Sequence, residues 1–135
     1  MGQFRKRQMR WANIWLWTAT ALGGLGWGIV AVVFAAVGPS QYVPHVFYSY
    51  HIEHFVAFYV LTTLAAIGFV RIKLLHIVLS FILMALVLAT VRLLIPRHIF
   101  NDAEDLAADL AGIAAVAIPV MVGRFRQSFG AAEPL

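Results

Sequence analysis

Four long apolar stretches take up most of this 135-residue chain. They cover residues 11–37, 46–70, 74–91 and 105–123, and each has close to the roughly 20 residues that a helix needs to cross a hydrocarbon core. Because backbone N–H and C=O groups find no partner in lipid, a membrane-spanning chain must form helices or a closed barrel. The alternating polar positions of barrel strands are missing here. The sequence therefore predicts an all-α integral membrane bundle of four transmembrane helices, with residues 1–135 in a single domain.

The composition leaves too little polar surface for a protein surrounded by water. Hydrophobic residues make up 62% of the chain and charged residues 12%, whereas soluble domains have about 45–50% and about 25%. There is no cysteine, which excludes disulfides, thiolate metal sites and thiol catalysis. The net charge of +4 could suggest nucleic acid, but the basic residues lie beside the apolar stretches, where anionic headgroups explain them. We therefore expect a lipid bilayer, and no nucleic acid, as a partner.

The basic residues predict the orientation of the chain, because short loops rich in Lys and Arg stay in the cytoplasm. Eight of the ten lie at the two termini and in the turn between the second and third stretches: Arg5, Lys6, Arg7, Arg10, Arg71, Lys73, Arg124 and Arg126. The other two, Arg92 and Arg97, lie on the opposite side. Both termini are therefore predicted to be cytoplasmic, in a multi-pass protein of the bacterial inner (cytoplasmic) membrane.

Small residues follow one face of the first stretch. Gly24, Gly28 and Ala31 are spaced at four and three residues, which places them on one side of a helix. Small residues at this spacing let two helix backbones approach closely in lipid. The partner helix is either another helix of the same bundle or the same helix of a second copy. A homodimer through Gly24, Gly28 and Ala31 is thus one of two open interpretations.

Most of the acidic residues and histidines lie at the beginnings of the second and fourth stretches. Charged side chains are costly in lipid unless they lie at the membrane surface or face other protein. Because both stretches are expected to begin on the extracytoplasmic side, these residues are predicted to converge on one polar patch. Its principal members are His51, His54, Arg97, Asp105 and Asp109, and its secondary members are Glu53, Arg92, Asp102 and Glu104.

The spacing within each stretch supports this convergence. His51 and His54 are three residues apart and share a helical face, and Asp105 and Asp109 are four residues apart. Asp109 lies about one turn inside its helix, where an ionised carboxylate costs up to roughly 2.5–3.5 kcal/mol. It therefore needs a partner inside the bundle. His54 and Arg97 are the best-placed candidates.

Three interpretations of the patch stay open. Its residues could be ordinary helix-start groups and ion pairs, since Asn101 and Glu104 have the spacing of a capping box and the helix dipole stabilises acids in a first turn. They could bind a lipid headgroup or another small polar ligand. They could also hold a divalent metal ion or act as general acid and base. Neither catalytic residues nor a cofactor can be assigned from the sequence, and no metal ligands are assigned.

The beginning of the second stretch resembles part of a known family. Residues 51–58 contain the pair His54-Phe55, followed by Phe58 and then Leu61. This run is similar to the start of a central helix in VanZ-like membrane proteins, where a His-Phe pair is followed by an aromatic residue. The family often has Asp and Lys before that pair, where this chain has Tyr50 and His51.

A later segment resembles a second motif of the same family, which reads Pro-Gly-Arg, then Asp, then Asn or Asp, then Gly. Here Pro96 and Arg97 are adjacent, without the glycine, and the gap from Arg97 to Asp105 is longer than is usual in the family. Asp109 and Gly112 follow. The residues that carry over from the family are His54, Arg97, Asp105, Asp109 and Gly112.

The resemblance covers roughly residues 40–123 and implies a small multi-pass inner-membrane protein. One branch of the family is linked to resistance to glycopeptide antibiotics such as teicoplanin, and no established reaction is implied. Together with the mixed charges of the patch, the resemblance leads us to expect a non-catalytic protein. Such a protein would bind or organise a cell-envelope lipid, such as a lipid-linked precursor, or a membrane partner. The alternatives are an accessory subunit of a larger membrane complex and a metal-assisted hydrolase of a lipid phosphate.

Overall fold

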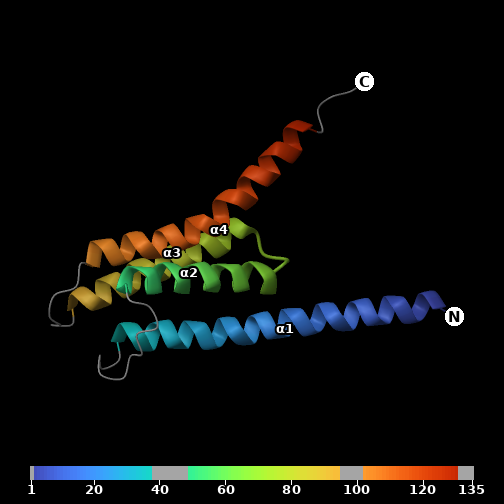
Figure 1. Ribbon diagram of the computed structural model, residues 1–135, viewed down its shortest axis with the longest axis horizontal. Coiled ribbons are helices and arrows are strands. Elements are labelled where there is room, and N and C mark those ends of the chain that lie inside the picture. The colour runs from blue at the N-terminus through green and yellow to red at the C-terminus, as the bar shows by residue number, and fades with distance from the viewer. Residues whose placement is uncertain (1, 38–48, 95–101, 131–135) are drawn as a thin grey trace.

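The computed structural model describes residues 2–37, 49–94 and 102–130, and every regular element within these ranges is an α-helix (Figure 1). The helices are α1 (Gly2–Val37), α2 (Tyr50–Gly68), α3 (Leu74–Leu94) and α4 (Asp102–Gly130). Each of the four is long and apolar enough to cross a membrane. The predicted all-α bundle of four transmembrane helices is thus confirmed, and the chain is a multi-pass membrane protein.

The helices do not coincide with the apolar stretches of the sequence. α1 begins at Gly2, well before its apolar window Ile14–Ala36, and α4 continues to Gly130. Intrahelical hydrogen bonds satisfy the backbone whether or not the side chains are apolar, so a helix can extend beyond the lipid. α2 is shorter than the predicted stretch 46–70, because it begins at Tyr50, after the extended residue Ser49, and ends at Gly68 before the turn that leads into α3.

The helices run alternately in opposite directions, so α2 and α4 begin at the same end of the bundle (Figure 1). α2 is the central helix: it packs most extensively against α4 and also contacts α1 and α3. α1 lies on the side of the bundle that faces away from α4 (Figure 1). The beginning of α1, the turn between α2 and α3, and the end of α4 all lie toward the other end.

Most of the apolar core lies between α2, α3 and α4, and Leu25 and Ala36 of α1 also belong to it. Phe58 of α2 and Ile113 of α4 are almost completely buried, together with Ala85 of α3. The ring of Phe81 on α3 meets the ring of Phe58 edge to face, with 6.4 Å between the centroids. Such a ring pair contributes about 0.5–1.5 kcal/mol beyond the burial of its area. The core thus holds the helices of the bundle together.

Gly112 determines how closely α2 and α4 approach. A Cβ atom at this position would overlap the carbonyl oxygen of Phe55 and lie 3.0 Å from the backbone nitrogen of Tyr59. Both atoms belong to the backbone of α2, which cannot move aside as a flexible side chain can. The missing side chain therefore permits the close approach that helices in lipid achieve with small residues. This contact brings the first turns of α2 and α4 within reach of each other.

Two of the small residues of α1 face α2. A Cβ atom on Gly28 would lie 2.6 Å from a methyl carbon of Leu61, and one on Gly24 would lie 3.4 Å from a methyl carbon of Leu64. Ala31 is exposed. Gly24 and Gly28 thus serve packing within the bundle, and a homodimer through this stripe stays a prediction.

α4 bends near its middle, and its final part points away from the other helices (Figure 1). Pro119 lies inside the helix, where it lacks a backbone N–H and its ring crowds the carbonyl of Ala115. Every residue from 118 to 127 is exposed, whereas Ala117 is still buried. The bend therefore separates a packed half of α4 from an unpacked half.

Candidate functional site

Polar residues from the beginnings of α2 and α4 meet at one end of the bundle. Because the two helices run in the same direction, successive turns of α2 face successive turns of α4. His51 contacts the first turn of α4, and His54 contacts the next turn. An arginine in the last turn of α3 joins them. We call this group the polar cluster; its members are His51, His54, Arg92, Glu104, Asp105 and Asp109.

The deeper part of the polar cluster is one enclosed pair. Nδ1 of His54 donates to Oδ1 of Asp109 at 2.7 Å, and the two residues are only 8% and 3% exposed. The ring of Tyr50 packs edge-on against the ring of His54, with 4.7 Å between the centroids. Hydrogen bonds to an ionised group are short and strong, and more so where water is excluded. The pair lies one helical turn from Phe58 and Ile113, so it covers the apolar core.

The outer part of the polar cluster is partly open to the surface. Nδ1 of His51 lies 3.0 Å from Oδ1 of Asp105, and Nε2 of the same ring lies 3.1 Å from Oε2 of Glu104. The side chain of His51 is 45% exposed and that of Glu104 is 59% exposed, whereas Asp105 is buried. His51 thus connects a buried carboxylate with an exposed one.

Asp105 has a second neighbour on α3. Nη1 of Arg92 lies 3.6 Å from Oδ2 of Asp105, which is too long for a hydrogen bond. The dipoles of both helices favour this pair, because an acid in a first turn and a base in a last turn are each stabilised. Oδ2 is buried and has no hydrogen-bond partner among the described residues. A buried acceptor without a donor is costly, so an N–H or O–H group brought to this oxygen would be stabilising.

Three further residues were predicted for the site: Glu53, Asp102 and Arg97. Glu53 lies in the first turn of α2 and is partly buried, and Asp102 is the first residue of α4. Arg97 lies outside the described residues, as does Asn101 of the expected capping box. Of the two partners predicted for Asp109, the structure therefore places His54 beside it. Arg92, predicted only as a secondary member, lies beside the buried Asp105.

No role in the polar cluster was predicted for Tyr50. Its ring covers the ring of His54 at the beginning of α2. The available sequence signal is the spacing of four residues between them, which places both side chains on one helical face. Tyrosine is also common at membrane interfaces, and this general preference explains Tyr50 without a contact to His54.

The possible metal ligands of the polar cluster form two separate groups, one around His51 and one around His54. A metal-assisted hydrolase would need His51, His54, Asp105 and Asp109 around one ion. Instead, each histidine uses its Nδ1 atom on a different carboxylate. Within the described ranges, no three His, Asp or Glu side chains are placed to hold a single metal ion. The geometry of these residues therefore favours hydrogen bonding over metal coordination.

Comparison with known proteins assigns no family. No family model, curated protein or solved structure matches this chain. What the polar cluster does is therefore inferred from its own contacts, its exposure and its position in the membrane-spanning bundle.

Proposed function

We propose that this protein is a VanZ-like protein of the bacterial inner membrane that binds a cell-envelope lipid without catalysing a reaction. The binding site is the outer part of the polar cluster, on the extracytoplasmic side. One observation carries the proposal: Asp105 is only 2% exposed, and its Oδ2 has no hydrogen-bond partner among the described residues. His51 and Glu104 lie next to it and remain open to the surface.

The orientation in this proposal rests on the distribution of charge. Arg71, Lys73, Arg124 and Arg126 are exposed at the end of the bundle opposite the polar cluster. Positively charged segments stay in the cytoplasm, so this basic end is the cytoplasmic one. The polar cluster then faces the side on which cell-envelope precursors are used.

The charges of the polar cluster favour a headgroup that carries hydroxyl or amino groups. Glu104 and Asp105 are acceptors, and Arg92 is the one guanidinium among the described members. A phosphate alone would be repelled by the two carboxylates, whereas the hydroxyl groups of a sugar would donate to them. A lipid-linked saccharide fits, with its hydrocarbon chain in the bilayer beside α2 and α4.

The two parts of the polar cluster have different roles in this proposal. The enclosed pair of His54 and Asp109 holds α2 against α4, and the outer residues contact the ligand. No serine, threonine or cysteine belongs to the described cluster, which favours binding over covalent catalysis. A lipid that is bound but not cleaved requires only that the outer residues stay accessible.

Native mass spectrometry with a polyprenyl diphosphate-linked saccharide tests this proposal on the detergent-purified protein. We expect Glu104→Gln to weaken binding about tenfold or more, because a hydrogen bond to a charged group contributes about 1.5–3 kcal/mol. His51→Ala should have a similar effect. His76→Ala, an exposed histidine near the start of α3, is the matched control and should bind like the wild type. Equal binding by all three variants, or by the same polyprenyl diphosphate without its saccharide, would contradict the proposal.

A second candidate, an accessory subunit of a larger membrane complex, is favoured by α1. This helix extends beyond the others toward its N-terminus (Figure 1), and its residues Trp15, Trp17 and Trp27 are exposed. Exposed tryptophans fit a helix–helix interface as well as the lipid interface. Co-purification of one partner at a fixed ratio after mild extraction would favour the subunit. A monomeric protein that binds the saccharide lipid would favour the first proposal.

A further inference from the structure

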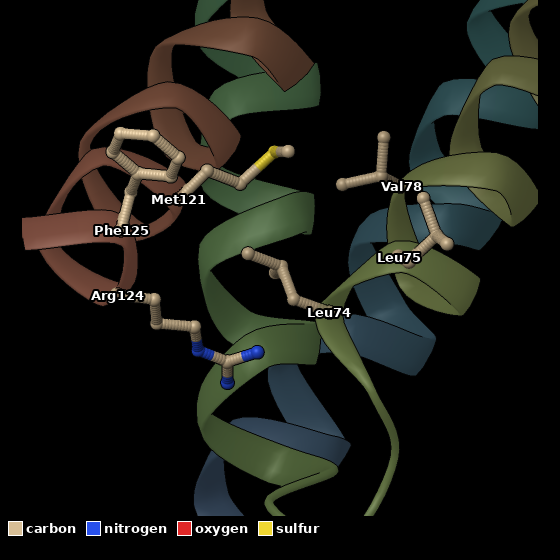
Figure 2. A pocket seen from close by; sticks show the side chains of 6 residues that line it. All are labelled: Leu74, Leu75, Val78, Met121, Arg124 and Phe125. Carbon is tan, nitrogen blue, oxygen red and sulfur yellow. The ribbon is translucent and has the colours of Figure 1, made fainter. Parts of the chain in front are cut away.

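A groove lies between the start of α3 and the bent end of α4 (Figure 2). Its volume is about 390 Å³, which is within the roughly 300–1,000 Å³ of small-molecule sites. It is at the opposite end of the bundle from the polar cluster. We call it the α3–α4 groove; it is lined by Leu74, Leu75, Val78, Met121, Arg124 and Phe125.

The bend in α4 produces this groove. Beyond Pro119 the helix turns away from α3, so Met121 and Val78 face each other across a gap (Figure 2). Deeper in the bundle, Ile113 and Ala117 on the same helix are buried. A gap with apolar walls does not bind ordered water, because water needs polar partners there. In a bilayer, a hydrocarbon chain fills such a gap.

One charged side chain enters the apolar α3–α4 groove. The guanidinium of Arg124 reaches across it toward Leu74 (Figure 2). None of the salt bridges between described residues includes Arg124. The acidic side chains that the structure describes all lie toward the opposite end, near the beginnings of α2 and α4. Among the described residues this guanidinium therefore has no counter-ion, and an anion from another molecule can supply one.

We propose that the α3–α4 groove binds one anionic phospholipid, with an acyl chain between Met121 and Val78 and the phosphate on Arg124. Leu74 is the first residue of α3, so the guanidinium lies where the membrane-spanning part of the helix begins. Headgroup phosphates lie at this depth, at the boundary of the hydrocarbon core. The apolar part of the groove therefore lies at the depth of the acyl chains of a phospholipid, and the guanidinium lies at the depth of its phosphate.

The charge around the α3–α4 groove favours an anionic lipid over a second copy of the chain as its occupant. Arg71 and Lys73 are exposed before α3, and Arg126 is exposed on α4. A second copy would bring the same positive charges to the groove. An anionic lipid brings the opposite charge, and basic residues near a membrane surface attract such lipids. This site does not depend on the saccharide-lipid site proposed for the polar cluster.

Two pairs of matched variants test the α3–α4 groove. In the first pair, Arg124→Gln removes the charge inside the groove and Arg126→Gln removes a charge beside it. In the second pair, Met121→Trp fills the groove, whereas Val122→Trp adds the same ring to a neighbouring exposed position. Because all four positions are exposed, the helical content in circular dichroism should be unchanged. Each variant is titrated with phosphatidylglycerol and with phosphatidylcholine, and bound lipid is counted by native mass spectrometry.

We expect the wild type to bind one phosphatidylglycerol more tightly than phosphatidylcholine. Arg124→Gln should weaken phosphatidylglycerol binding about fivefold, the loss expected for one basic residue at a membrane surface, and Arg126→Gln should not. Met121→Trp should weaken binding of both lipids relative to Val122→Trp, since the acyl chain loses its space. Equal behaviour within either pair, or no preference for the anionic lipid in the wild type, would overturn the proposal.

Discussion

Two buried carboxylates of α4 differ in how well their oxygens are satisfied. Asp109 has a hydrogen bond from His54 at 2.7 Å, whereas Asp105 has His51 on one oxygen and only the distant Arg92 near the other. In an apolar environment a satisfied pair stabilises the fold, and an unsatisfied oxygen remains available to a ligand. Under the proposed function, Asp109 therefore has a structural role and Asp105, one helical turn before it, has a binding role.

Replacing His54 should destabilise the protein strongly. In His54→Ala, the carboxylate of Asp109 loses its hydrogen-bond donor but stays buried. The free energy of unfolding should therefore fall by about 3–5 kcal/mol. In the double variant His54→Leu with Asp109→Leu, most of this loss should be recovered, because neither polar group remains buried. Denaturant unfolding in mixed micelles measures both. His76→Ala, which changes an exposed histidine, should stay within about 0.5 kcal/mol of the wild type. A His54→Ala protein as stable as this control would show that the pair does not hold the helices together.

The relation between α2 and α4 depends on one glycine. Where Gly112 meets the backbone of Phe55, a side chain has no room, and where Gly28 meets Leu61, only a flexible side chain is in the way. Close contact at Gly112 also determines which turns face each other farther along, so it positions His51 and His54 against the acids of α4. The histidines and acids of the polar cluster are therefore brought together by the helix pair and not by either helix alone.

Gly112→Ala should separate α2 from α4. Overpacking of a tight contact costs about 1–3 kcal/mol, so the melting temperature in detergent should fall. Gly28→Ala should cost less, since the side chain of Leu61 can rotate away. A Cβ atom added to Gly123 would meet nothing within 4 Å, so Gly123→Ala should be neutral or should stabilise α4 by up to about 1 kcal/mol. If all three variants melt alike, the close approach at Gly112 does not control the packing.

The whole molecule has two polar ends with different chemistry. One end carries the polar cluster, with acids and histidines held between helices, and the other carries exposed basic residues around the α3–α4 groove. A four-helix bundle of this kind presents one end to each side of a membrane. The proposed lipid sites are therefore on opposite membrane surfaces.

The absence of cysteine makes this topology directly testable. Ser49→Cys places a thiol just before α2, and Lys73→Cys places one just before α3. Because the basic end is expected in the cytoplasm, a membrane-impermeant thiol reagent should label only Ser49→Cys in intact cells. Both variants should be labelled after permeabilisation. Labelling of Lys73→Cys alone in intact cells would place the polar cluster in the cytoplasm.

The sequence by itself determined the class of this fold and indicated that His51, His54, Asp105 and Asp109 would lie at the same end of the bundle. Long apolar stretches require helices in lipid whatever their neighbours are, so hydropathy alone predicts the four helices. The spacing of His51 and His54 likewise predicts a shared face. The tertiary structure decided which groups pair, because pairing depends on the rotation and register of one helix against another. Contacts between helices produce the roles of Arg92 and Tyr50, the steric role of Gly112 and the groove beside Arg124. The residue pattern along a single segment does not predict such contacts.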